Sequence, residues 1–356
     1  LRAGGSGGFS DGRGAWLVEL RRGTTDLVDK LIGSEAPRYA DAYAKLSYRL
    51  NERHSLRFHT LLSDDRLRYD EVLEDESKHT DTSYRSAYFW VEHTAILGDK
   101  LLVETALSRA GLDQDRRGEE LEEGVSFDVA DLRNSEVLDL RQHWHWRASP
   151  RHLLKWGVEL RAFDTGYDYD ANFVFDDPLA AIRDEQEEGS TVFAGEFEER
   201  HSALFVTDRM RLAERLGLEL GLRFDRHTLT DEGHLSPRVN LAWTPDEASV
   251  VRVAWGRFLQ SQRPYELQVE DGETGFYPTE RSDHRVLGYE RLFAGGSAWG
   301  GLNFRVELYK RRVGNPRPRY ENLYEALNTF PELEPDRVRI APDNSTAQGV
   351  ELFLQG

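Results

Sequence analysis

The sequence predicts an all-β protein, a transmembrane antiparallel up-and-down β-barrel. Two observations lead to this prediction. Apolar and polar residues alternate in many segments, and short and long connections between these segments follow each other in turn along the chain. We expect about 14–16 strands with long acidic outer loops, all within one partial barrel domain at residues 1–356, as part of a barrel with about 22 strands.

Composition excludes several other classes of protein. The 356 residues include no cysteine, so the chain has no disulfide, thiolate nucleophile or thiolate metal site. Its 46 basic and 64 acidic residues give a net charge of −18, which argues against nucleic acid as a partner. No segment approaches the roughly 20 apolar residues of a membrane-spanning helix. Nothing in the sequence points to a cofactor.

The strands are predicted from a two-residue period. In 215–225 the even positions are apolar, whereas the odd positions are charged residues or glycine. Such a segment has one apolar and one polar face, as a β-strand does. Clear copies of the pattern occupy 137–147, 153–162 and 302–311. Weaker copies, with a Gly-rich first strand at 2–9, bring the total to about fifteen and occupy 15–22, 39–50, 54–63, 83–97, 100–110, 200–210, 237–244, 249–258, 282–293 and 347–355.

Strand length and aromatic placement favour a membrane barrel over a soluble sandwich. Many predicted strands reach about ten residues, which is enough for a tilted strand to cross a bilayer. Tyr48, Trp144 and Trp146 lie on apolar faces near strand ends. Membrane barrels place an aromatic girdle at that position.

The connections indicate an up-and-down order. Short connections are expected at 51–53, 97–100, 149–151, 213–214, 244–247 and the Gly-rich 294–300. Long connections are expected at 64–82, 111–136, 164–196, 229–236, 259–281 and 314–346. Tight turns on one rim and large loops on the other are typical of outer-membrane barrels, whereas Greek-key sandwiches have no reason to keep this order.

The acidity of the chain is concentrated in three segments. Residues 64–82, 111–136 and 164–200 carry net charges of −5, −6 and −10, which leaves the remaining residues near +3. All three segments belong to the predicted long connections, so we expect an acidic outer rim above a nearly neutral barrel. Such a rim would concentrate cations and could meet the divalent ions that bridge lipopolysaccharide.

An odd strand number is incompatible with a closed bacterial barrel, because open strand edges are not tolerated in lipid. The last predicted strand ends beside Gly356. We therefore expect the parent protein to continue with further strands.

Several segments resemble the barrel of TonB-dependent outer-membrane receptors. Residues 235–246 (LSPRVNLAWTPD) resemble a stretch in which "SPR" opens a strand and an aromatic residue followed by x–Pro closes it. Residues 251–258, 280–290 and 317–323 with 349–352 resemble the next strands of such barrels, and residues 13–62 resemble their first hairpins.

The resemblance implies a receptor in the outer membrane of a Gram-negative bacterium that imports a scarce nutrient, such as a ferric siderophore. The implied partners are a small nutrient ligand, outer-membrane lipid and lipopolysaccharide, and the TonB–ExbB–ExbD complex, which is reached through an N-terminal plug. We expect this plug and the final strands of the barrel to belong to parts of the parent protein outside the present sequence. We expect a monomer that is not an enzyme. The alternatives are a passive porin-like channel and an outer-membrane adhesin or enzyme. Cobalamin, metal ions and oligosaccharides remain alternative ligands.

Few residues suggest chemistry. Ser6 lies in a G-x-S-x-G pattern, but the strand and helix that a nucleophile elbow requires are missing. His143 and His145 share a strand face and are weak metal candidates, because two ligands do not make a site. The start of a calcium loop at Asp168 and Asp170 lacks the glycine and glutamate that the EF-hand needs further along.

Aromatic and basic residues of two long connections are the better ligand candidates. They offer stacking faces and bidentate donors for anions. The substrate-binding candidates are Arg263, Tyr265, Phe276, Tyr277, Arg317, Arg319 and Tyr320.

Overall fold

A computed structural model describes residues 1–23, 37–72, 76–122, 124–174, 188–293, 301–322, 330–333 and 337–356. Nearly all of them are in strands. The strands are β1 (Arg2–Phe9), β2 (Gly14–Arg22), β3 (Arg38–Asn51), β4 (His54–Val72), β5 (Ser77–Leu97), β6 (Leu101–Glu122), β7 (Val125–Ser149), β8 (His152–Val174), β9 (Glu188–Ala213), β10 (Leu216–His227), β11 (Glu232–Asp246), β12 (Ser249–Gln260), β13 (Glu280–Phe293), β14 (Leu302–Gly314), β15 (Arg319–Asn322), β16 (Arg337–Ile340) and β17 (Asn344–Gln355). Three 3₁₀ turns are η1 (Pro264–Glu266), η2 (Val269–Asp271) and η3 (Pro331–Leu333).

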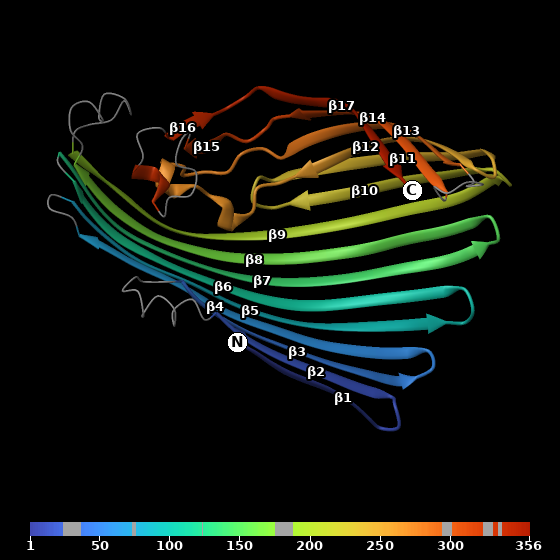
Figure 1. Cartoon of the computed structure of the whole chain (residues 1–356), viewed down its shortest axis with the longest axis horizontal. Helices are drawn as coiled ribbons and strands as arrows, with labels where there is room; N and C mark the ends of the chain where they lie inside the picture. Colours follow the sequence, from blue (N-terminus) through green and yellow to red (C-terminus); the bar gives the residue numbers. More distant parts are fainter. Residues whose placement is uncertain are drawn as a thin grey trace.

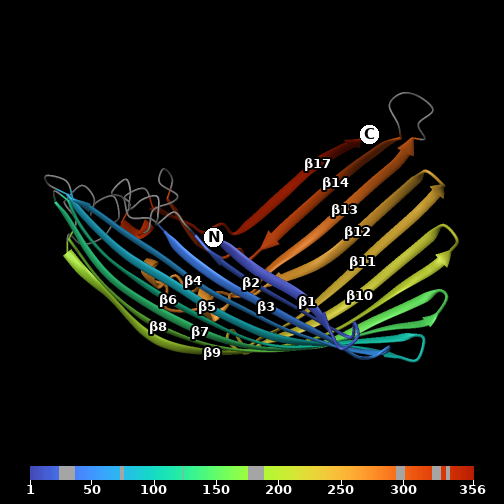
Figure 2. The ribbon, with the colours of Figure 1, turned by 60° about the horizontal axis from the view of Figure 1, so that its bottom comes forward.

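Fifteen strands form one antiparallel sheet in which every neighbour in space is the neighbour in sequence, with β17 following β14. This confirms the predicted up-and-down order and the strand number. Strands β15 and β16 form a separate hairpin between β14 and β17. The large sheet is strongly curved and open, as Figures 1 and 2 show. Among the described residues β1 and β17 are its edge strands.

Three of the expected long loops prove to be strands. The described residues of the acidic segments 64–82, 111–136 and 164–196 continue β4 to β9, which reach 19–26 residues and extend well beyond the other strands in Figure 1. Residues 73–75, 123 and 175–187 of these segments lie outside the described residues. On β7 and β8 an apolar two-residue period does continue, as the buried residues Phe127, Val129, Tyr167 and Tyr169 show. On β4 and β5 charged and polar side chains dominate the extension while the backbone ladder continues. Cross-strand ion pairs such as Arg66–Asp81 replace apolar contacts there, with a nitrogen–oxygen distance of 2.6 Å.

The remaining connections agree to different degrees with the lengths predicted from the sequence. The expected loop at 229–236 is also shorter, because β11 begins at Glu232. The connections at 259–281 and 314–346 are long, as predicted. The Gly-rich connection at 294–300 lies outside the described residues. The two rims therefore differ less in loop length than the sequence suggests.

The outer face of the sheet carries the apolar half of each strand. Leu160, Leu204 and Leu222 are among its exposed side chains. The predicted girdle is present at the short-turn ends. Trp144 stacks on Trp156 with ring centroids 5.9 Å apart, and Tyr48 stacks on Phe9 at the same distance. No helix in the described part of the chain is long and apolar enough to cross a membrane.

Candidate ligand-binding site

Parts of two long connections cover the inner face of the sheet at its long-strand end. They are residues 261–279, with η1 and η2, and residues 330–333, with η3, and together we call them the inner cap. In Figure 1 this cap lies inside the curve of the sheet, near the far ends of β6 to β9. Leu267, Val269 and Phe330 of the cap are almost completely buried. They pack on inward residues of β7 and β8, namely Phe127, Val129, Tyr167, Tyr169 and Ala171.

Hydrogen bonds fix the orientation of the cap. The Tyr167 hydroxyl donates to the carbonyl oxygen of Pro264 at 2.8 Å and accepts from the amide of Leu267 at 3.2 Å. Turn η2 ends at Gly272, whose φ of 79° lies in the left-handed region that favours glycine. Its amide donates to the carbonyl oxygen of Val269. These bonds satisfy buried backbone groups that a loose loop would leave unpaired.

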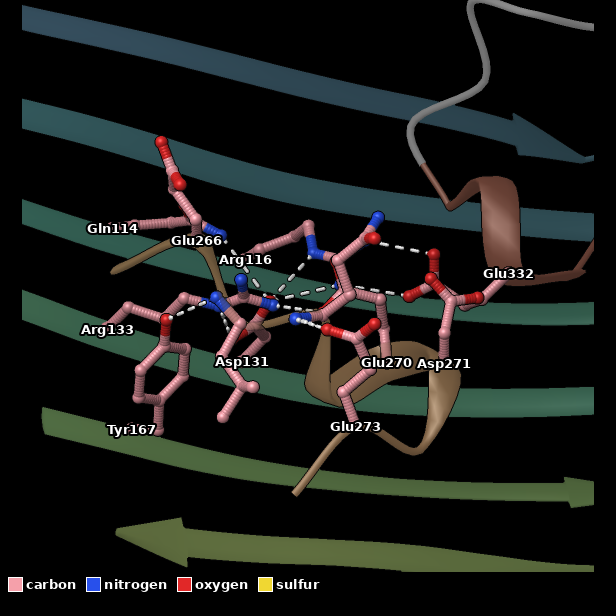
Figure 3. Close-up of polar contacts among 12 residues, drawn as sticks. Gln114, Arg116, Asp131, Arg133, Tyr167, Glu266, Glu270, Asp271, Glu273 and Glu332 are labelled. Atoms are coloured by element: carbon pink, nitrogen blue, oxygen red, sulfur yellow. Dashed lines mark hydrogen bonds and ion pairs between the residues drawn. The ribbon is translucent and has the colours of Figure 1, made fainter. Parts of the chain in front are cut away.

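A buried ion network joins the cap to the wall (Figure 3). Arg116 of β6 contacts Asp131 of β7 at 3.0 Å and Glu332 of η3 at 2.9 Å. Arg133 contacts Asp131 at 2.8 Å and Glu270 of η2 at 2.6 Å. Buried charges are costly unless paired, so each carboxylate here depends on its arginine. Burial raises the pKa of the Glu332 carboxyl, and Arg116 opposes this shift.

The hairpin of β15 and β16 is tied to the cap in the same way. Arg337 of β16 and Asp271 of η2 form a bidentate pair with both nitrogen–oxygen distances at 2.6 Å. The guanidinium of Arg337 also lies over the ring of Tyr320, 5.8 Å from its centroid. The two long connections of this rim therefore form one assembly.

A cavity of about 510 Å³ opens between these connections. It is polar and carries both signs of charge. Its lining consists of Gln262, Glu266, Gln268, Glu273, Tyr277, Glu280, Pro316, Arg317, Pro318, Arg319, Pro342, Asn344 and Ser345. We call it the rim pocket.

Two arginines give the rim pocket its donors, and they are held differently. Arg317 is fixed, because its Nη1 lies 2.8 Å from Glu266 and its amide donates to Glu280. Arg319 contacts Glu321 at 2.6 Å but leaves 66% of its side chain exposed. Burial raises the pKa of the Glu273 carboxyl, and hydrogen bonds from Gln268 and Tyr277 oppose the shift.

The seven residues predicted to bind ligand are divided among three places. Tyr277, Arg317 and Arg319 line the rim pocket. Tyr320 lies nearby, because Arg339 hydrogen-bonds both Tyr320 and Tyr277.

The other three candidates face the wall of the sheet. Phe276 makes an edge contact with Phe197, with centroids 5.0 Å apart. Arg263 and Tyr265 pack on Phe163, at 5.2 Å and 6.1 Å from its ring centroid. The carboxylates of the pocket escaped sequence reasoning, because nothing in the local pattern separates them from other loop acids.

The two histidines considered for a metal do not converge on one carboxylate. His143 contacts Glu159 of β8 at 3.2 Å, whereas His145 contacts Glu104 of β6 at 3.2 Å. Within the described residues, a group of side chains with metal-ligand spacing is found instead at His201, Asp225 and His227.

The remaining sequence patterns are parts of strands. Asp168 and Asp170 lie in β8 rather than in a loop, and Ser6 lies in β1 opposite Leu17. Neither arrangement is that of a calcium loop or a nucleophile elbow.

Comparison with known proteins points to one family. A family model described as "TonB dependent receptor-like, beta-barrel" matches residues 3–356. A search of curated proteins finds no match.

Solved structures share the fold at low sequence identity. A mutant of the ferric enterobactin receptor PfeA from Pseudomonas aeruginosa is 14% identical, with a TM-score of 0.65 over 98% of this chain and 56% of that one. The ferric preacinetobactin receptor BauA from Acinetobacter baumannii is 11% identical, with a TM-score of 0.61 over 99% and 57%. FpvA from P. aeruginosa, bound to a heterologous pyoverdine and iron, is 12% identical, with a TM-score of 0.60 over 100% and 51%. The chain thus spans about half the length of these structures.

Proposed function

Because the chain belongs to the TonB-dependent receptor β-barrel family, whose members lie in the outer membrane of Gram-negative bacteria, we propose that it serves the uptake of a ferric siderophore. In this proposal it acts as a receptor and transporter and not as an enzyme. The solved structures that resemble it include proteins named as receptors of ferric enterobactin and ferric preacinetobactin. They support the proposal through the shared fold.

The observation that carries the proposal is the rim pocket. It lies at the long-strand end, between the two long connections, and it presents Arg317, Arg319 and Tyr277. Arginine forks bind carboxylate and similar anionic groups, and a tyrosine ring adds a stacking face. A polar cavity of about 510 Å³ suits part of a chelate too large for simple diffusion through a narrow pore.

The pocket is tested by binding of iron chelates to the full-length receptor in detergent. A panel of ferric catecholate, hydroxamate and carboxylate siderophores is titrated against intrinsic fluorescence. We expect one class to bind, and Arg319→Ala to weaken it at least tenfold, because the largely exposed guanidinium is available for a ligand.

A second arginine provides the matched control. Arg215 lies on the short-turn rim and bonds the carbonyl oxygen of Pro245, so Arg215→Ala should leave binding unchanged. The proposal is wrong if no ferric chelate binds, or if both substitutions have equal effects.

The same proposal includes partners of the complete receptor. The open edges β1 and β17 require pairing, with each other or with further strands, because lipid does not tolerate them. The TonB–ExbB–ExbD complex would supply the energy for uptake through contact with a plug, and the receptor would work as a monomer. Lipopolysaccharide would meet the outer face where Arg109 and Arg200 line a largely apolar groove together with Glu136 and Glu198.

A passive channel is less well supported. The inner cap occupies the concave face and is fixed there by buried leucine, valine and phenylalanine side chains. A simple pore would instead keep this face open to water.

A further inference from the structure

Four ligand-type side chains form a compact group on the inner face of β9 and β10. The register places His201 of β9 directly opposite His227 of β10. Glu199 and Asp225 each precede one of these histidines by two residues, so they share its face of the sheet. Because the strands are antiparallel, the two carboxylates lie on opposite sides of the histidine pair.

The contacts cross between the strands. His201 Nε2 lies 2.9 Å from Asp225 Oδ1, and His227 Nδ1 lies 2.8 Å from Glu199 Oε1. The two imidazole rings stack with centroids 4.3 Å apart. All four residues are buried, with exposed fractions between 1% for Glu199 and 7% for His201 and Asp225.

This arrangement has the spacing of a metal site. One ligand atom from each of His201, Asp225 and His227 lies within 4.8 Å of the other two. Two imidazoles and one carboxylate are the protein ligands of many Zn²⁺ sites. A carboxylate that holds the second nitrogen of a ligating histidine, as Glu199 would hold His227, is the usual means of orienting such a ring.

Two arginines lie near this group of side chains. Arg223 contacts Asp225 at 2.9 Å, but it also contacts Glu159 of β8 at 2.7 Å and would keep that partner. Arg263 of the inner cap lies 3.8 Å from Glu199. Within the described part of the chain, Glu199 Oε2 and Arg263 Nη1 are both buried without a hydrogen-bond partner. A buried carboxylate oxygen that no neighbour satisfies is an unusual feature of a folded protein.

We propose that His201, His227 and Asp225 bind a divalent transition-metal ion of the Zn²⁺ class, with Glu199 orienting His227. The two rings tilt out of their stack on binding, which brings their nitrogens to the separation of ligands about 2.0–2.1 Å from one ion. The imidazoles select such an ion over Mg²⁺ or Ca²⁺, which prefer oxygen ligands. The site lies beside Arg263, so the ion would sit where the cap meets the wall.

The experiment uses the full-length receptor, purified without a histidine tag and stripped of metal with a chelator. Zn²⁺ is titrated by calorimetry, and the Zn²⁺-loaded protein is measured by X-ray absorption. We expect one equivalent of Zn²⁺ to bind and the spectrum to show two imidazole ligands. Binding of no Zn²⁺, or a spectrum with fewer than two imidazoles, would overturn the proposal.

Variants locate the ion. His201→Gln and His227→Gln should each weaken Zn²⁺ binding more than tenfold, and Glu199→Gln should weaken it about tenfold, as is typical for a group that orients a ligand. His145→Gln is the matched control, because His145 is an ion-paired histidine on the same inner face. Equal affinity in His201→Gln and in the unmodified receptor would refute the assignment. Heat-modifiable electrophoretic mobility confirms that each variant is folded. If a variant does not fold, the X-ray absorption spectrum of the unmodified protein still shows whether two imidazoles bind the ion.

Discussion

Replacement of Leu267 by alanine tests whether the inner cap is held by its apolar contacts. The side chain is 0% exposed and packs in the cluster on β7 and β8. The change removes three carbon atoms, which costs about 2.4 kcal/mol at roughly 0.8 kcal/mol per buried methylene. The cavity left behind raises the cost to about 3 kcal/mol or more. Leu267 belongs to the cap and not to the strands, so we assign this cost to docking of the cap on the sheet. A free-energy change of about 1.4 kcal/mol shifts an equilibrium constant tenfold, so the cap should open roughly 150-fold more often.

Native-state hydrogen exchange of the full-length receptor measures that opening. The amides of Asp271, Gly272 and Glu273 are reporters, because each donates a hydrogen bond within the cap. Their protection should fall in Leu267→Ala while that of the long strands is kept. Leu287→Ala is the control, because Leu287 is 46% exposed on the outer face. Unchanged protection of the three amides would show that the cluster does not hold the cap.

Three further predictions concern the same assembly. Arg116→Ala leaves Asp131 buried without this counter-charge and should destabilise docking by about 3–5 kcal/mol, measured by exchange in the cap. Gly118→Ala should displace η3, because a Cβ atom there would lie 2.1 Å from Cζ of Phe330, and residues 330–333 should lose protection from protease. Glu273→Gln should stabilise docking of the cap at pH values above the ordinary titration range of a carboxyl group. The measurement is hydrogen exchange of the cap amides, corrected for the effect of pH on the intrinsic exchange rates. Burial raises the pKa of Glu273, so its contribution is complete at low pH and is lost as the pH rises through that pKa.

Each of these predictions has a control. Arg117 is largely exposed and paired with Asp115, so Arg117→Ala should cost less than about 1 kcal/mol. Gly111 lies in the same strand as Gly118 but has open space at the Cβ position, so Gly111→Ala should have no effect on η3. Equal effects within either pair would contradict the packing described above. A pH dependence of docking that is unchanged in Glu273→Gln would exclude Glu273 as its source.

The membrane-facing half of the fold is readable in the sequence. The alternation in 215–225 predicts both strand β10 and the outward direction of Leu222, because a strand repeats every two residues and one side must face lipid. Trp144 and Tyr48 mark the girdle for the same local reason. The order of the strands also follows, since consecutive strands joined by short connections pair with each other.

The extent of the strands and the composition of the sites required the tertiary structure. At the acidic ends of β7 and β8 an apolar period is present in Phe127, Val129, Tyr167 and Tyr169, but the inner cap that buries these residues is visible only in the structure. Three predicted ligand residues, Tyr277, Arg317 and Arg319, do line one pocket, but only folding of the inner cap brings Glu266 and Glu273 beside them.

Two pairs of histidines show most clearly the difference between what the sequence and the tertiary structure reveal. His143 and His145 stand two residues apart and are visible as a pattern, yet they contact different carboxylates. His201 and His227 are 26 positions apart in the numbering, and only the β9–β10 register sets them opposite each other. The sequence determined which residues face inward, because that depends on a period of two along each strand. The tertiary structure decided which inward residues meet, because register is set by the pairing of whole strands.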